Sequence, residues 1–328
     1  MNPMFSRILQ ALCTFAAVAL LSGCGGASST VEPFVATRVI AFGDGFNFVD
    51  ANGAGKSTVR TGETDITIAG RVAARYGIVV KDVATGPALS ATGGFSYATA
   101  SAKVSDVATQ INTFLTSAGG VVAKKDLIVI AVGNWDIKDA IASGTPTADI
   151  DTATTNLVTA IQRLTNAGAE HVVVMPPINM ARTPWATTYI GANAGVTRAA
   201  IQDLSNSAAT SFNFKLLAKL QAAYTQDRNP VVLLDRTTDF NSFAGSVDAS
   251  GTAVVNYSGV SLTNLSTAVC TTASPAAGCT TAVGAGGLIN STDYLTSVFA
   301  DEINLTPVMN RFLADRIIYS LVSFGWAP

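Results

Sequence analysis

Five short apolar runs, separated by segments with helical spacing, constrain this chain more than any other feature. The runs begin at residues 38, 78, 126, 171 and 230 and are rich in Val, Ile and Leu. Continuous apolar strands of this kind are buried on both faces, as in a parallel sheet that is covered by helices. The sequence therefore predicts an α/β fold with a doubly wound, flavodoxin-like, parallel five-stranded sheet of strand order 2-1-3-4-5.

Helices are expected between these strands and after the last one. The predicted segments are 66–76, 104–115, 150–164, 196–224 and 307–322. The last of them starts with Thr306 as N-cap and Pro307 at the first helical position, which is a typical helix start. In a doubly wound sheet, ligands bind beyond the carboxyl ends of the strands, so functional residues are expected there.

A long segment rich in Gly, Thr, Ser and Ala precedes the last helix and breaks the strand–helix alternation. We interpret residues 240–294 as a loop-rich insertion over the functional edge of the sheet, within a single domain that spans 37–328. Cys270 and Cys279 lie in this insertion and are expected to form a disulfide in an oxidising compartment. A metal site is the weaker alternative, because no histidine or carboxylate neighbours them.

The N-terminal segment 1–23 has the anatomy of a bacterial signal peptide. Arg7 supplies a positive charge, and a short apolar run ends at Leu21-Ser22-Gly23-Cys24, which is similar to a lipobox. This resemblance implies cleavage before Cys24 and acylation of that cysteine, so the expected partner is membrane lipid. Residues 24–36 then form a tether, and Gly25 after the cysteine favours the outer membrane. An ordinary cleaved signal is the alternative.

Composition excludes several other classes of function. Charged residues make up 13% of the chain and the net charge is −2, with no basic cluster, so a nucleic-acid partner is not expected. No motif for a cofactor or a metal is present. Gly53-Ala54-Gly55-Lys56-Ser57-Thr58 is similar to part of a P-loop, but Asp50 stands where the first glycine belongs. We interpret that segment as a flexible loop.

Four segments carry short motifs at or near predicted strand ends. They read Phe42-Gly43-Asp44-Gly45, Gly93-Gly94-Phe95-Ser96-Tyr97-Ala98, Gly133-Asn134-Trp135-Asp136, and Phe299-Ala300-Asp301-Glu302-Ile303-Asn304-Leu305-Thr306-Pro307. Together they resemble the signature blocks of the SGNH hydrolases, the GDSL esterase and lipase family. The resemblance implies an ester-hydrolase fold, a serine nucleophile in the first block, oxyanion donors in the second and third, and an Asp–His pair in the last.

The chain departs from this pattern at the reacting positions. Gly45 replaces the nucleophilic serine, Asn304 replaces the histidine base, and Trp135 replaces the asparagine that donates to the oxyanion. Gly94 stands at the other oxyanion position, and Asp301 keeps the position that orients the base. Asp44 and Asp136 are the expected supporting residues. The indole of Trp135 is expected to fill the cleft above Gly45.

His171, the only histidine in the sequence, cannot take over the role of the base. It opens a predicted strand and therefore lies at the amino edge of the sheet, roughly 17 Å from the edge that would hold the site. Asp44 and Asp301 could instead work as a carboxylate pair. The preferred interpretation is that each of them accepts local hydrogen bonds.

Three functions remain open. The first is an envelope-anchored, catalytically inactive pseudoenzyme that binds a ligand or partner. The second is an active esterase or lipase with a rearranged site that uses Ser96 or Ser101. The third is a structural or assembly lipoprotein whose cleft is filled. Aromatic residues near the strand ends suggest a small acyl or glycan ligand; they are Phe46, Phe48, Phe95, Tyr97 and Trp135.

Overall fold

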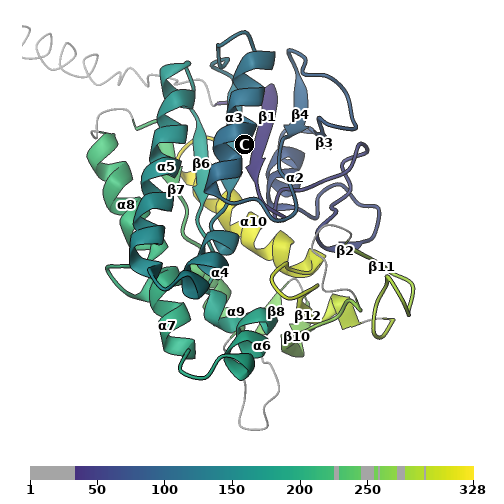
Figure 1. Cartoon of the computed structure of the whole chain (residues 1–328). Coiled ribbons are helices and arrows are strands. Elements are labelled where there is room, and N and C mark those ends of the chain that lie inside the picture. Colours follow the sequence, from purple (N-terminus) through teal and green to yellow (C-terminus); the bar gives the residue numbers. More distant parts are fainter. Residues whose placement is uncertain (1–33, 225–228, 245–254, 258, 272–277, 292) are drawn as a thin grey trace, which may run out of the picture. The chain divides into compact units, whose positions relative to one another are not determined.

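A six-stranded parallel sheet forms the centre of the computed structural model (Figure 1). Its strands are β3 (Val80–Asp82), β4 (Gly93–Ser96), β1 (Arg38–Gly43), β5 (Asp126–Ala131), β6 (Val172–Met175) and β7 (Val231–Leu233), in that spatial order. The structure describes residues 34–328 except 225–228, 245–254, 258, 272–277 and 292. The signal peptide, Cys24 and most of the predicted tether therefore lie outside the described residues. The compact unit begins at Phe34.

The α/β class and the relative order of the five predicted strands are confirmed, but the number of strands was wrong. β4 lies between β3 and β1 and pairs in parallel with both. It begins with two glycines, so it carries no apolar run that would identify it as a strand. Gly94 is required there, because a Cβ on it would stand 2.6 Å from the Val79 carbonyl oxygen.

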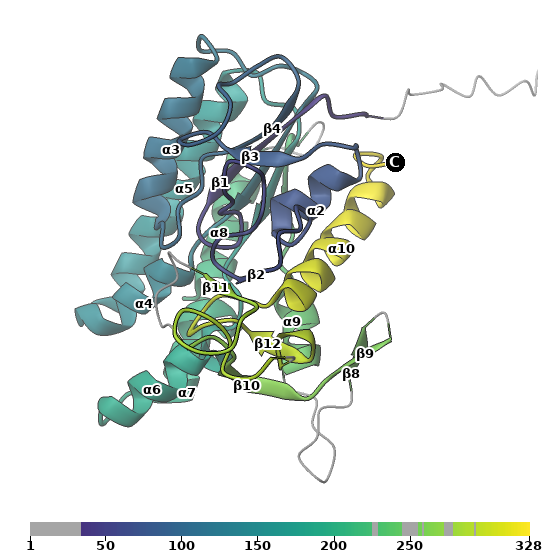
Figure 2. The same cartoon turned by 90° about the vertical axis from the view of Figure 1, so that its right-hand side faces the viewer.

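Helices cover both faces of the sheet (Figure 2). On one side lie α3 (Val104–Ser117), α4 (Asn134–Ser143), α5 (Pro146–Asn166) and α8 (Phe212–Ala223), and on the other lie α2 (Ile68–Ala74) and α10 (Pro307–Ser323). Each covered strand face is buried, as in all six residues of β1 and of β5. None of the helices in the described part of the chain is long and apolar enough to cross a membrane.

The long helix predicted over 196–224 is not continuous. The chain forms α7 (Arg198–Gln202), a π-helical turn (Asp203–Ser207) and then α8, which starts after the N-cap Ser211. The Ser211 hydroxyl accepts a hydrogen bond from the Phe214 amide, which satisfies a free donor at the new helix start. Further helices not predicted are α4, α6 (Pro184–Ala192) and α9 (Thr237–Ala244).

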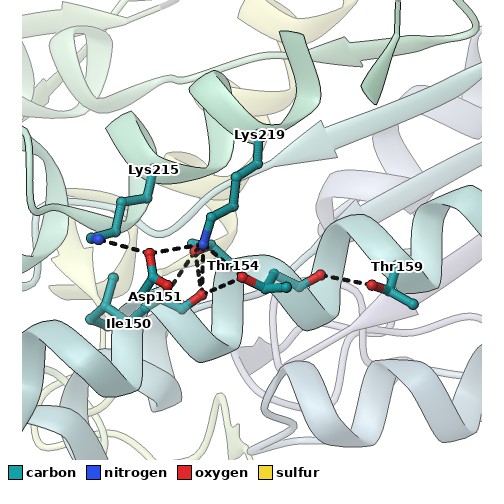
Figure 3. A network of polar contacts seen from close by, with 7 residues as sticks. Ile150, Asp151, Thr154, Thr159, Lys215 and Lys219 are labelled. Atoms are coloured by element: carbon teal, nitrogen blue, oxygen red, sulfur yellow. Dashed lines mark hydrogen bonds and ion pairs between the residues drawn. The ribbon is translucent and has the colours of Figure 1, made fainter. Parts of the chain in front are cut away.

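A polar network joins α5 to α8 (Figure 3). The Lys219 ammonium donates to the Asp151 carboxylate at 2.9 Å and to the Thr154 hydroxyl at 2.9 Å, and Lys215 reaches the same carboxylate at 2.8 Å. These two lysines hold the pKa of Asp151 at about 2. The network fixes the position of α8 along α5 at the surface of the helical layer.

The segment 240–294 forms short strands that pack beside the last block. The strands β8 (Val255–Tyr257) and β9 (Val260–Leu262) form a hairpin, and β10 (Asn264–Ala268) pairs with β12 (Ser297–Phe299), just before Asp301. β11 (Cys279–Thr280) pairs with β2 (Val59–Arg60). The predicted disulfide between Cys270 and Cys279 is present. The insertion therefore contacts the chain segments on both sides of the candidate site.

Candidate functional site

Asp44 lies at the carboxyl end of β1 and accepts hydrogen bonds from two directions. Its Oδ1 accepts from the Phe46 amide at 3.1 Å, and its Oδ2 accepts from the Asn134 side chain at 3.0 Å. Burial raises the pKa of this carboxyl from 3.8 to about 7, although both hydrogen bonds lower it. The expectation that Asp44 accepts a local hydrogen bond is confirmed, because its carboxylate accepts from the Phe46 amide.

Gly45, the next residue, has no room for a side chain. A Cβ built on its backbone would stand 2.7 Å from the Ser57 Cβ, and closer still to the Asn304 Oδ1. Both neighbours are buried, with 1% of their surface exposed. The volume that a serine would need at position 45 is therefore taken by the side chains of residues 57 and 304.

Asp301 holds Asn304 in this position. Its Oδ1 accepts from the amides of Ile303 and Asn304 at 2.8 and 2.7 Å, and its Oδ2 accepts from Asn304 Nδ2 at 2.9 Å. The expectation of local hydrogen bonds at Asp301 is thus confirmed, and burial raises the pKa of its carboxyl. With Nδ2 bound to Asp301, Oδ1 of Asn304 points to Gly45 and has no hydrogen-bond partner among the described residues.

Trp135 does not fill the space above Gly45 as expected. The atoms nearest to a Cβ at that position belong to Asn304 and Ser57. Trp135 lies in the first turn of α4 and is partly buried, and Lys138 Nζ stands 4.7 Å from the centre of its ring. Asn134, one residue earlier, reaches the candidate site instead, because it donates to Asp44 and accepts from the Ile178 amide.

Two other predicted site residues serve local structure. Gly94 pairs with Val39 inside the sheet, two residues before the Ala41–Ser96 pair, so its amide lies away from the carboxyl edge. Asp136 accepts from the amide of Val104 at 3.2 Å and so binds the first turn of α3. Burial raises its pKa to about 6. The charge of Asp136 also raises the pKa of Asp44, the residue before Gly45.

Sequence reasoning missed Ser57 and Asn134. Ser57 belongs to a Gly- and Thr-rich segment that resembles a flexible loop, but Ser57 and Thr58 are both buried. The hydroxyl of Thr58 donates to the Leu305 carbonyl at 2.7 Å, which joins this loop to the last block. Ser96, a hydroxyl considered for a rearranged site, is buried and donates to the Asn47 carbonyl at 2.9 Å.

His171 lies at the opposite edge of the sheet, as predicted. It precedes the first residue of β6, stacks on Phe34 with ring centres 3.6 Å apart, and meets Trp326 edge to face. Burial lowers the pKa of its imidazole. It lines a cavity of about 370 Å³ with Lys124, Glu170 and Trp326 at that edge. No group of three or more metal-ligating side chains occurs in the part of the chain that the structure describes.

A larger cavity of about 420 Å³ is lined by residues that follow β3 and β4 and by Gln110, whose side chain binds the backbone of Gly43. Phe48, Lys56, Asp82 and Tyr97 are among its lining residues. It offers room for a small molecule near the carboxyl edge of the sheet. Neither Gly45 nor Asn304 lines it.

A comparison with known protein families gives a match over most of the chain. Residues 39–317 match the GDSL-like Lipase/Acylhydrolase family. The chain belongs to this family. Family membership covers the GDSL/SGNH hydrolase fold, and the fold alone does not decide what this GDSL-like chain does.

Solved structures similar to this GDSL-like chain share little sequence with it. One is "Salicylyl-Acyltransferase SsfX3 from a Tetracycline Biosynthetic Pathway", with 12% identity, a TM-score of 0.42, and coverage of 91% of this chain and 56% of that one. Another is a member of the lipolytic protein G-D-S-L family from Veillonella parvula DSM 2008, with 12% identity, a TM-score of 0.41, and coverage of 87% and 96%. This chain therefore spans little more than half of the acyltransferase. No curated protein matches the sequence significantly.

Proposed function

We propose that this protein is a catalytically inactive GDSL-family lipoprotein of the bacterial envelope that binds a small ligand. The observation that carries the loss of catalysis is the filled volume at Gly45. A nucleophile at this position needs a side chain, and Asn304 and Ser57 occupy the place where its first carbon would stand. The glycine at position 45 is therefore consistent with the close packing of Asn304 and Ser57 around it.

The remaining polar groups do not supply a base. An asparagine at position 304 takes no proton at neutral pH, and His171 lies at the amino edge of the sheet. Asp44 and Asp301 accept hydrogen bonds from neighbouring amides and amide side chains. Their raised pKa values follow from burial, which is also common in purely structural carboxyls.

The envelope anchor rests on the N-terminal sequence. Leu21-Ser22-Gly23-Cys24 supports acylation of Cys24 and attachment to the outer membrane, facing the periplasm or the exterior. The disulfide between Cys270 and Cys279 fits an oxidising compartment. Ligand binding, rather than a purely structural role, is favoured by the cavity of about 420 Å³ beside Gly43.

Two measurements test this proposal. The purified protein is expected to hydrolyse p-nitrophenyl acetate and butyrate no faster than a heat-denatured sample, and a fluorophosphonate probe is expected to label no serine. Turnover together with labelling at Ser57, Ser96 or Ser101 would instead establish an active enzyme with a rearranged site. Mass spectrometry of the mature N-terminus tests the anchor. We expect acylated Cys24, and an unmodified N-terminus at another residue would refute it.

A further inference from the structure

The cavity beside Gly43 has largely apolar walls. Phe48, Tyr97 and Ala98 come from the segments that follow β1 and β4, and Val83 and Ala84 follow β3. Its volume of about 420 Å³ lies within the range of small-molecule sites in proteins. These residues offer a ligand an apolar surface and no reactive group.

Asp82 and Gln110, two polar side chains of the wall, are engaged within the protein. Asp82 Oδ1 accepts from the Ala84 amide at 3.1 Å, and Oδ2 accepts from the Thr85 hydroxyl at 2.6 Å. The Gln110 amide group pairs with the backbone of Gly43, accepting from its N–H at 2.8 Å and donating to its carbonyl at 3.1 Å. Both side chains therefore stabilise the turn and the strand end that shape the cavity.

Lys56 is the exception in this wall. Its ammonium lies over the ring of Phe48, 4.2 Å from the ring centre, and no carboxylate of the described residues lies within ion-pair distance of it. An ammonium group has three N–H donors and accepts nothing, and an aromatic face satisfies only part of that capacity. A ligand that complements this cavity therefore brings a negatively charged oxygen to Lys56.

We propose that the cavity binds a small amphipathic carboxylate. The carboxylate pairs with Lys56 at the edge of the site, and an apolar body packs against Phe48, Val83 and Tyr97. The negative charge of Asp82 in the same wall disfavours a second anionic group on the ligand. This inference deepens the ligand-binding part of the proposed function and depends on neither the anchor nor the loss of catalysis.

Calorimetric titration of the full chain with three eight-carbon probes tests this assignment. Octanoate, octan-1-ol and octylammonium share the apolar body and differ in charge. We expect octanoate to bind about tenfold more tightly than either of the others, since a charge-assisted hydrogen bond adds to burial of the chain. Equal affinity for all three probes, tighter binding of octylammonium, or no binding of octanoate would overturn the proposal.

Matched variants locate the site. Lys56→Gln is expected to weaken octanoate about tenfold and leave octan-1-ol unchanged. Lys138→Gln is the control, because Lys138 also lies over an aromatic ring but does not line the cavity. Ala84→Phe fills the cavity and is expected to abolish binding of all probes in a protein that still melts cooperatively. Equal losses from Lys56→Gln and Lys138→Gln would contradict the assignment. Ester turnover is measured separately. A failure of this ligand assignment can therefore be told apart from a failure of the proposal that the protein is catalytically inactive.

Discussion

The Oδ1 atom of Asn304 occupies the position that a Cβ on Gly45 would need. The amide nitrogen of the same Asn304 side chain is bound to Asp301 at 2.9 Å, so the side chain cannot turn away without losing that hydrogen bond. Residues 45 and 304 are therefore coupled through packing.

Gly45→Ala is expected to destabilise the fold by roughly 1–3 kcal/mol, because a buried side chain is forced into occupied volume. Asn304→Ala in the same chain should recover about 1 kcal/mol of this loss relative to the sum of the two single changes. Urea unfolding of the four proteins of this cycle measures the coupling. Gly191→Ala is the control, since Gly191 is an exposed helical residue with no atom near its Cβ position. Strictly additive losses would show that the two residues do not share this volume.

Asp44 is expected to make the protein less stable as the pH rises. Its folded pKa of about 7 is higher than the 3.8 of the unfolded chain, so its contribution is complete below pH 4 and is lost as the pH rises through 7. One such group changes the free energy of unfolding by up to about 1.4 kcal/mol per pH unit in this window.

Asp44→Asn should flatten the dependence of the free energy of unfolding on pH between 4 and 7, where Asp136 and Asp301 contribute in the same direction. Denaturant unfolding at several pH values measures the slope. The control is Asp151→Asn, because Asp151 has a lowered pKa of about 2 and titrates below this window. An unchanged slope in Asp44→Asn would mean that Asp44 stays ionised throughout.

Removing the disulfide is expected to loosen the loop that carries Ser57. β11 starts at Cys279, whose amide donates to the Thr58 carbonyl at 3.2 Å. Cys270→Ala with Cys279→Ala should lower the free energy of unfolding by about 2–3 kcal/mol. Hydrogen exchange should also become faster at Val59 and Arg60, and remain unchanged in β5. Exchange rates at Val59 and Arg60 equal to those of the unaltered protein would contradict this.

Lys219→Met should weaken the contact between α5 and α8 only slightly, because Asp151 is half exposed and solvent screens its charge. The loss should shrink in 1 M salt, and it should vanish as the pH falls from 4 through 2, where Asp151 becomes protonated. Thermal melts in low and high salt measure it. Lys124→Met is the comparison, since that lysine is 84% exposed and pairs only with Glu170. A loss that is independent of salt would assign the effect to packing.

The sequence predicted the sheet well, because a strand buried on both faces needs a continuous apolar run, as in Val39–Phe42 and Leu127–Ala131. β4 escaped prediction because Gly93 and Gly94 have no side chains to form such a run. The prediction of one continuous helix over 196–224 was wrong, since apolar spacing continues across the break before Ser211.

The sequence predicted which residues meet at the candidate site, but not all of the side chains that touch one another there. The motifs placed Gly45, Asp301 and Asn304 near one another, and the hydrogen bonds of Asp301 are those expected. The expected occupant of the space above Gly45 was wrong, because the side chains next to its Cβ position are those of Asn304 and Ser57. Ser57 comes from a loop whose composition is typical of exposed segments, yet Ser57 is buried and the adjacent Thr58 binds the last block.

The stacking of Phe34 on His171 shows where the chain enters the described structure, which is at the amino edge of the sheet. Gly45 and Asn304 lie at its carboxyl edge. Nine residues lie between Cys24 and Phe34 in the sequence, which gives a reach of at most about 35 Å. If Cys24 is acylated as proposed, the lipid is joined to the domain through the amino edge of the sheet, and the candidate site lies at the opposite edge.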